Sequence, residues 1–142
     1  ENPSLLQLNG KKRKGLEQAF VFRTGVHLNG LIEKSDYKSF NLDAEYNKNG
    51  TDSKKTNRFP KGIRPDLILH QRGTNDNNKI AVEFKGFWSK GKAKKDRKKL
   101  EDLTAQAGDY CYLLGVLVLI GQDKPDFEIY KNGEKCAYEE LE

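Results

Sequence analysis

The chain has 142 residues, of which 35% are hydrophobic and 33% charged, with a formal net charge of +5. This length predicts one domain, residues 1–142, with a core of its own. No apolar run reaches the ~18–20 residues of a membrane span, so we expect no membrane partner. The tail from Gln122 onward is acidic, and positive charge gathers in residues 11–14, 48–64 and 85–99. Segregated positive charge suits a polyanion, but charge alone fits a solvated basic surface equally well.

The sequence contains no methionine, even at position 1, so we expect a processed product or an excised fragment. Its two cysteines, Cys111 and Cys136, match no zinc or redox spacing. We expect Cys111 to be a buried free thiol because it adjoins an apolar segment; a disulfide with Cys136 is the less favoured alternative. No signal peptide is recognisable, and we expect a cytoplasmic protein of prokaryotic or phage origin.

The first third of the chain predicts a helix and a strand. Residues 1–9 are expected to be a loose lead-in. Apolar residues recur at helical spacing over residues 11–28, and Gly25 and Gly30 indicate that this helix ends near them. Four basic residues at the helix start oppose its dipole, which is mild evidence that they serve another purpose. Strict alternation over residues 37–47 predicts a half-buried strand.

A basic loop over residues 48–62 is followed by two short predicted strands, residues 64–70 and 79–85. The turn between them is rich in Gly, Asn and Asp, which predicts an antiparallel pair. In the second strand, alternation sends one face to the core and leaves the other face, with Glu83 and Lys85, for chemistry.

The last part of the chain predicts a strand, helix crossover and strand arrangement, so part of the sheet should be parallel. After a flexible stretch, residues 92–108 read as a helix with an apolar stripe. Residues 112–120 read as a central strand, by length and apolarity. Residues 127–130 read as an edge strand, and a turn at Asn132 and Gly133 predicts a final strand.

Asp66, Glu83 and Lys85 are the most informative residues. Two carboxylates on neighbouring strands can hold a hard divalent cation. Lys85 lies two residues after Glu83, on the same face of its strand, because side chains alternate. A cation, two ligands and an ammonium group around one point are suited to breaking a phosphodiester. The alternative is a pair of surface carboxylates with a salt-bridged lysine.

Pro65-Asp66 followed by Glu83-Phe84-Lys85 resembles the PD-(D/E)xK nuclease motif. The predicted αβββαβ order is similar to the core of that superfamily, and the resemblance covers nearly the whole chain. It implies an α/β, restriction-endonuclease-like fold, with a mixed central sheet flanked by helices. The segments RPDLILHQRGTNDNNKIAVEFK, DRKKLEDLT and YCYLLGVLV, with the earlier DAEYN, are similar to an uncharacterised bacterial lineage of nuclease-like proteins.

The resemblance implies a role for each residue. Asp66 and Glu83 would be metal ligands and the Phe84 carbonyl a third oxygen, a set that suits Mg²⁺, with Mn²⁺ as a substitute. Lys85 would orient or deprotonate the attacking water, or stabilise developing negative charge. A helical glutamate commonly completes the metal shell in this family, and Glu17 is the candidate. The alternative for Glu17 is an ordinary exposed position on its helix.

Further residues are candidates for substrate contact. Gln106 and Tyr110 have a spacing similar to a substrate-contacting motif of RecB-like nucleases; the alternative is a solvated helix face with a capping tyrosine. The lower-ranked candidates are Tyr110, Glu45, whose alternative is a partner for Arg64, and His70, which shares a strand face with Asp66. The residues expected to bind nucleic acid are Arg64, Lys92, Lys95, Lys98, Lys99 and Gln106.

These observations predict a Mg²⁺- or Mn²⁺-dependent endonuclease that hydrolyses phosphodiester bonds, with DNA favoured over RNA. The alternatives are a ribonuclease or toxin domain acting on RNA or tRNA, and a non-catalytic nucleic-acid binder that kept the fold. Many relatives cut duplexes as dimers, so a homodimer is one arrangement to test. A toxin fragment would have a larger parent protein or an inhibitor as partner. No P-loop or GxGxxG motif supports nucleotide hydrolysis, and two histidines without metal spacing do not indicate zinc.

Overall fold

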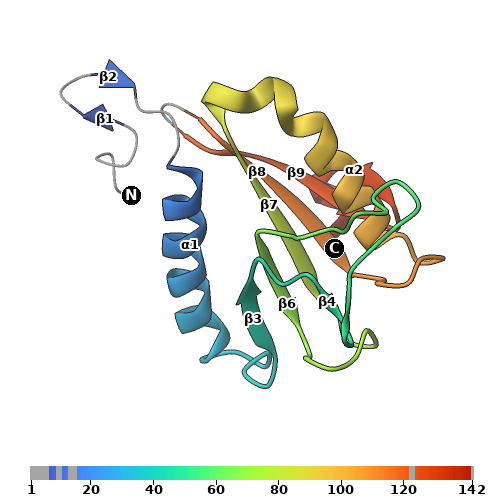
Figure 1. Cartoon of the computed structure of the whole chain (residues 1–142). Helices are drawn as coiled ribbons and strands as arrows, with labels where there is room; N and C mark the ends of the chain where they lie inside the picture. Colours follow the sequence, from blue (N-terminus) through green and yellow to red (C-terminus); the bar gives the residue numbers. More distant parts are fainter. Residues whose placement is uncertain (1–6, 9–10, 13–15, 122–123, 142) are drawn as a thin grey trace.

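A mixed six-stranded sheet forms the middle layer of the protein, in the order β10-β9-β8-β7-β6-β3. The computed structural model describes residues 7–8, 11–12, 16–121 and 124–141. Helices α1 (Glu17–Ile32) and α2 (Ala93–Thr104) lie on opposite sides of the sheet (Figure 1). The strands of the sheet are β3 (Asn41–Ala44), β6 (Leu67–His70), β7 (Ile80–Gly86), β8 (Leu114–Ile120), β9 (Asp126–Lys131) and β10 (Glu134–Cys136).

The strand directions follow from the connections. β3, β6 and β7 pair antiparallel, whereas β7 and β8 are parallel because α2 crosses over between them. Within the six-stranded sheet and its two helices, the predicted element order, the antiparallel first strands and the partly parallel sheet are therefore confirmed. The prediction that residues 127–130 form an edge strand is wrong, because β9 lies between β8 and β10. Asn132 and Gly133, at φ 55° and 85°, form the tight turn that returns β10 onto β9.

Two apolar clusters, one on each face of the sheet, form the core. On the α1 side, Val21 packs against Leu67, Val82, Phe84 and Ile120. On the α2 side, the cluster includes Ile68, Ala81, Leu100, Leu103 and Leu117. Alternate residues of β7 thus enter opposite clusters, and both faces of this strand are covered. Helix α2 packs over the face that was expected to be left for chemistry, and Glu83 is buried there.

The first helix differs most from its prediction. It begins at Glu17 and ends at Ile32, whereas residues 11–28 were expected. Lys11–Lys12 instead form β2, which pairs with β1 (Gln7–Leu8). Gly25 and Gly30 lie within the helix, because packing on the sheet outweighs the ~1 kcal/mol that a helical glycine costs. The rest of the predicted lead-in and residues 13–15 lie outside the described residues.

Other predicted elements are shorter than expected. β3 ends at Ala44, since Glu45 adopts a left-handed φ of 50°. The second helix ends at Thr104 and not near Gly108, because Ala105 is extended at ψ 121°. The predicted flexible stretch before it forms a 3-10 helix, η2 (Phe87–Lys92), and a second one, η3 (Tyr138–Leu141), closes the described chain. Both cysteines are half-buried free thiols, and none of the described helices is long and apolar enough to cross a bilayer.

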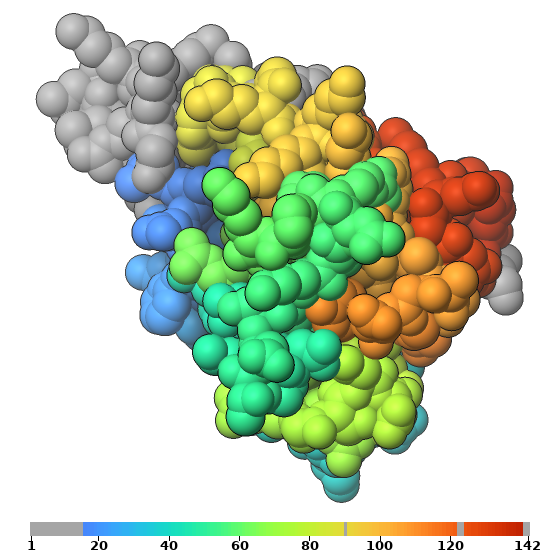
Figure 2. Space-filling model, turned by 45° about the vertical axis from the view of Figure 1, so that its right-hand side comes forward, coloured from blue at the N-terminus to red at the C-terminus, as the bar shows by residue number. Residues whose placement is uncertain are grey.

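The basic loop packs on α2 and contains a two-stranded hairpin, β4 (Lys48–Asn49) and β5 (Asp52–Ser53). Figure 2 shows this segment, in green, against the yellow and orange of α2 and the chain that follows it. Thr56 and Arg58 donate hydrogen bonds to Asp102 of α2, at 2.5 and 2.7 Å. The Tyr110 hydroxyl accepts from the Lys55 N–H at 2.6 Å and donates to its carbonyl at 2.9 Å. These bonds hold the loop beside the carboxyl end of α2.

Candidate active site

Asp66 and Glu83 lie side by side on the α2 face of the sheet. β6 and β7 pair with Leu67 opposite Val82, so Asp66, directly before β6, lies near Glu83, the residue after Val82, and its charge acts on Glu83. The carboxylate of Asp66 accepts a hydrogen bond of 2.7 Å from the backbone N–H of Phe84. Burial raises the pKa of Asp66, against the opposing effects of this hydrogen bond and of a nearby lysine.

Glu83 is almost completely enclosed, with 1% of its surface exposed. Its Oε2 atom lies 2.9 Å from the Lys99 ammonium nitrogen. Its Oε1 atom is buried and has no hydrogen-bond partner in the described structure. Burial raises the pKa of Glu83 to about 8, with Lys99 opposing the rise and Asp66 adding to it. An unpartnered buried oxygen carries a free-energy cost that a cation or a donor would remove.

Lys85 joins both helices to the end of β7. Its ammonium nitrogen lies 2.9 Å from Asp96 Oδ2 on α2 and 3.6 Å from Glu17 Oε1 on α1. Glu17 also accepts a 3.0 Å hydrogen bond from the Gly86 N–H through its other oxygen. Burial lowers the pKa of Lys85, but the hydrogen bond and charge of Asp96 outweigh it, so that the pKa is raised. The helical glutamate singled out from the sequence therefore reaches the same place as Lys85.

Asp96 is the residue that the sequence analysis left out of the site. It is 5% exposed, and its Oδ1 lies 3.1 Å from the Lys99 ammonium, one helical turn away. Lys99, expected to bind nucleic acid, thus bridges Glu83 and Asp96. A signal for this placement was present, because Asp96 occupies the apolar stripe of α2 that Ala93 and Leu100 define. A charged residue on a buried stripe requires a charged partner.

We refer to these six side chains as the carboxylate–lysine cluster: Glu17, Asp66, Glu83, Lys85, Asp96 and Lys99. Four carboxylates and two ammonium groups give a formal charge of −2 (2 − 4) when all are ionised. The cluster therefore carries a surplus of oxygen donors for a hard cation.

The described residues contain no group of three or more His, Cys, Asp or Glu side chains arranged to hold a metal ion. The set implied by the nuclease motif needs only two such side chains, Asp66 and Glu83, with the Phe84 carbonyl. The buried and unpartnered Oε1 of Glu83 fits this set, because it is an oxygen donor without a competing hydrogen bond. The donor chemistry is therefore compatible with Mg²⁺ or Mn²⁺.

The exposed candidates for nucleic-acid contact lie outside the cluster. Lys92, Lys95 and Lys98 are all solvent-exposed at the start of α2 and along it. Arg64 is also exposed, and its guanidinium lies 3.8 Å from Glu45. The structure thus gives Glu45 the partner that the sequence offered as its alternative role.

Three other candidates are placed elsewhere. His70 is 1% exposed and lies 2.9 Å from Asp43 on the neighbouring strand. Tyr110 is held by the basic loop, as described above. Gln106 donates to the backbone carbonyl of Thr104 at 2.8 Å. The prediction that Gln106 lies on the second helix is wrong, because that helix ends at Thr104. The side chains of Gln106 and Tyr110 both bond to backbone groups.

No family model matches this chain, and no curated protein matches it either. A nuclease function is thus a hypothesis from the resemblance of the motif and from the geometry described above.

Proposed function

We propose that this protein is a metal-dependent nuclease with a restriction-endonuclease-like core of the PD-(D/E)xK type, acting on DNA. One observation carries the proposal: the carboxylate of Asp66, directly before β6, bonds to the Phe84 N–H beside Glu83 of β7, and Lys85 shares the strand face of Glu83. The αβββαβ part of the element order and the mixed sheet support it. So does Glu17, which reaches the end of β7 from the first helix.

The roles of the residues follow from their positions. Asp66, Glu83 and the Phe84 carbonyl would hold Mg²⁺, which on binding polarises a phosphate oxygen and makes a bound water more acidic. Lys85 places a positive charge beside the reacting phosphate, where negative charge develops. Asp96 and Glu17 hold the Lys85 ammonium in place by their ion pairs. Lys99 shares Oε2 of Glu83 and leaves Oε1 for the cation.

The exposed lysines near the cluster support a polyanionic substrate. Lys92, Lys95 and Lys98 extend from the same helix that contributes Asp96 and Lys99. Such side chains neutralise phosphates without reading the base sequence. A DNA strand that lies along this helix would bring its backbone toward the carboxylate–lysine cluster.

Metal binding and cleavage test the proposal. Calorimetric titration with Mn²⁺, and cleavage assays on duplex DNA, single-stranded DNA and tRNA, should be performed on the wild type, Asp66→Asn and Glu83→Gln. We expect one Mn²⁺ to bind and a loss of at least about 100-fold in cleavage for either variant. Asp109→Asn is the matched control, because it removes the same charge from an exposed residue. Equal cleavage by Asp66→Asn and the wild type would refute the proposal.

One observation favours a second candidate function, a non-catalytic nucleic-acid binder. Both lysines of the cluster are already paired with carboxylates, as in a purely structural ion-pair network. In that case, Mg²⁺ would not change the affinity for nucleic acid, and neither Asp66→Asn nor Glu83→Gln would alter that affinity. Preferential cleavage of tRNA would instead favour the ribonuclease or toxin alternative.

A further inference from the structure

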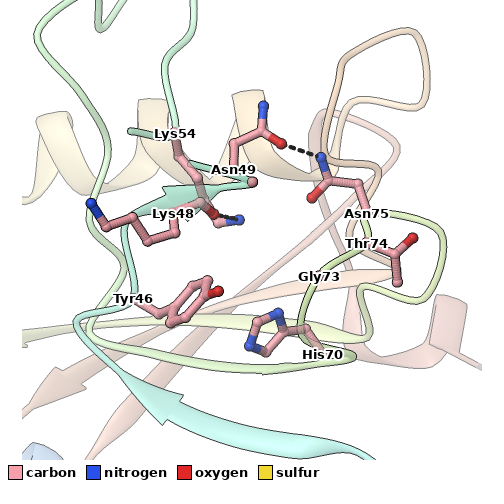
Figure 3. A pocket seen from close by; sticks show the side chains of 9 residues that line it. Tyr46, Lys48, Asn49, Lys54, His70, Gly73, Thr74 and Asn75 are labelled. Atoms are coloured by element: carbon pink, nitrogen blue, oxygen red, sulfur yellow. Dashed lines mark hydrogen bonds between the residues drawn. The ribbon is translucent and has the colours of Figure 1, made fainter. Parts of the chain in front are cut away.

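A second site lies away from the carboxylate–lysine cluster, in a pocket of about 280 Å³. The β4–β5 hairpin forms one side, and the end of β6 with the turn after it forms the other (Figure 3). Two lysines line the pocket, and none of the described residues that line it is acidic. The residues used in the argument below are Tyr46, Lys48, Lys54, His70, Thr74 and Asn75.

Lys54 is the unusual member of this pocket, because only 1% of its surface is exposed. Its ammonium donates a 2.6 Å hydrogen bond to the backbone carbonyl of Lys48. The rings of Tyr46 and Tyr110 lie 5.5 and 5.1 Å away. No carboxylate among the described residues lies within 4 Å of it. Lysine is rarely buried without a charged partner, because desolvating an unpaired charge is unfavourable. Burial accordingly lowers the pKa of Lys54 to about 8.

The backbone fixes Lys54 in this position. Its N–H donates to the Asn47 carbonyl at 2.5 Å, and its carbonyl accepts from the Ile63 N–H at 2.7 Å. Across the pocket, Asn75 donates a 2.8 Å hydrogen bond to the side chain of Asn49 (Figure 3). The two walls are thus tied together, and Lys54 is held in the lining of the pocket.

His70 brings a hydrogen-bond acceptor to the same pocket. Its Nε2 lies 2.9 Å from Asp43, whose carboxylate also pairs with Arg72. The hydrogen bond from Arg72 keeps the pKa of Asp43 low, and burial lowers the pKa of His70. An ionised carboxylate only accepts, so the proton of a neutral His70 is on Nε2. Nδ1 is then an acceptor, and it makes no hydrogen bond within the described part of the chain.

We propose that this pocket binds a phosphate group, with its anionic oxygens on the Lys54 ammonium and its P–OH donating to Nδ1 of His70. The amide nitrogen of Asn75 lies on the same wall and has a second N–H that can add a contact, besides the one that it donates to Asn49. The Thr74 hydroxyl already donates its proton to Asp76. A singly protonated phosphate has both an acceptor and a donor on one group, which matches a buried ammonium beside a neutral imidazole. Sulfate lacks the donor and is the natural comparison. This proposal is independent of the nuclease proposal, because it uses none of the cluster residues.

The test uses calorimetry and thermal unfolding at about pH 6, where about half of a phosphate monoester is singly protonated. The probes are inorganic phosphate, adenosine 5′-monophosphate, a 5′-phosphorylated oligonucleotide with its unphosphorylated counterpart, and sulfate. We compare the wild type with Lys54→Met, which keeps a stem of similar length and removes a buried charge; such a change is often tolerated. Lys55→Met is the matched control, because it removes the same charge from an exposed neighbour outside this pocket.

We expect at least one phosphate probe to bind the wild type and Lys55→Met, with affinity reduced about tenfold or more in Lys54→Met. Sulfate should bind about tenfold more weakly than inorganic phosphate. The probe with the highest affinity identifies the source of the phosphate group. Thr74→Phe, which fills the pocket from a turn, should also abolish binding and keeps the test valid if Lys54→Met does not fold. The absence of saturable binding up to about 10 mM, equal binding by Lys54→Met, or equal affinity for sulfate would overturn the proposal.

Discussion

Glu83 and Lys99 form an ion pair of 2.9 Å that connects β7 to α2 through the core of the protein. The pair lies where the side chains are only 2% and 15% exposed. Because a buried carboxylate without a counter-charge is strongly disfavoured, the lysine is what makes this glutamate tolerable in its position. Oε2 of Glu83 makes this contact, and Oε1 has no hydrogen-bond partner in the described structure. The stability of the fold and the proposed metal binding therefore both depend on Glu83.

Lys99→Met should destabilise the fold, because it leaves Glu83 without its cation. We expect a loss of about 1–3 kcal/mol in the free energy of unfolding. Glu83→Gln should restore part of this loss, since the buried charge is then absent. Urea unfolding of the wild type, both single variants and the double variant gives the coupling energy directly. Strictly additive effects would contradict the pairing.

Lys85→Ala should abolish turnover and leave the fold and substrate affinity largely intact. Lys85 faces the proposed reacting phosphate, and its loss leaves Asp96 still paired with Lys99. We expect a decrease of about 100-fold or more in the single-turnover rate and little change in binding measured by fluorescence anisotropy. Lys95→Ala, at an exposed position of α2, is the control and should retain the rate at saturation. Undiminished cleavage by Lys85→Ala would remove the lysine from the mechanism.

Replacing Lys92, Lys95 and Lys98 by glutamine should weaken binding to all DNA sequences alike. Each lysine that contacts a phosphate contributes about 0.9 to the slope of log affinity against log salt. The triple variant should therefore have a slope smaller by about 2–3. Filter binding or anisotropy between about 50 and 200 mM salt measures the change.

A matched triple variant controls for net charge. Lys34, Lys38 and Lys131 are exposed and lie outside α2, so their replacement by glutamine removes the same charge from other surfaces. This variant should keep most of the wild-type slope. Identical slopes for the two triple variants would show that the charge on α2 has no special role.

Glu128→Gln should cost stability in a pH-dependent way. Glu128 of β9 accepts two hydrogen bonds of 2.8 Å from Arg97 of α2, and they lower its pKa to about 2, against the opposing effect of burial. Because the pKa of this carboxyl is lowered in the folded state, its ionisation stabilises the fold at pH values above the ordinary pKa of 4.5. This stabilisation is lost as the pH falls toward 2. We expect the free energy of unfolding to decrease by about 1–2 kcal/mol at pH 7. This value allows for solvent screening, because Arg97 is partly exposed.

The difference in unfolding free energy between the wild type and Glu128→Gln should therefore shrink as the pH falls from about 4.5 toward 2. Urea unfolding at pH 7 and at about pH 3 measures it. Glu134→Gln, at an exposed position of β10, should have little effect at either pH. A pH-independent difference for Glu128→Gln would contradict the ion pair.

Local sequence patterns identified the types of the main elements. Alternation identified the strands that became β3 and β7, and the apolar run identified β8, because backbone geometry fixes the side-chain period. Boundaries were less accurate where packing overrides propensity, as at Gly25 within α1 and Ala105 after α2. The two-residue strands of the β4–β5 hairpin carry no periodic signal, so the basic loop was expected to lack strands.

Within the candidate site, the sequence by itself placed Asp66 and Glu83 on neighbouring segments and Lys85 on the same face as Glu83, because a short turn and strand periodicity fix these relationships. Only the tertiary structure decided that α2 covers this face, that Asp96 and Lys99 pair with the strand residues, and that Lys54 is enclosed without a carboxylate. The physical reason is the separation along the chain of the residues that interact. Periodicity is a property of neighbours along the chain, whereas burial and charge pairing depend on residues that only the folded packing of helix on sheet brings together.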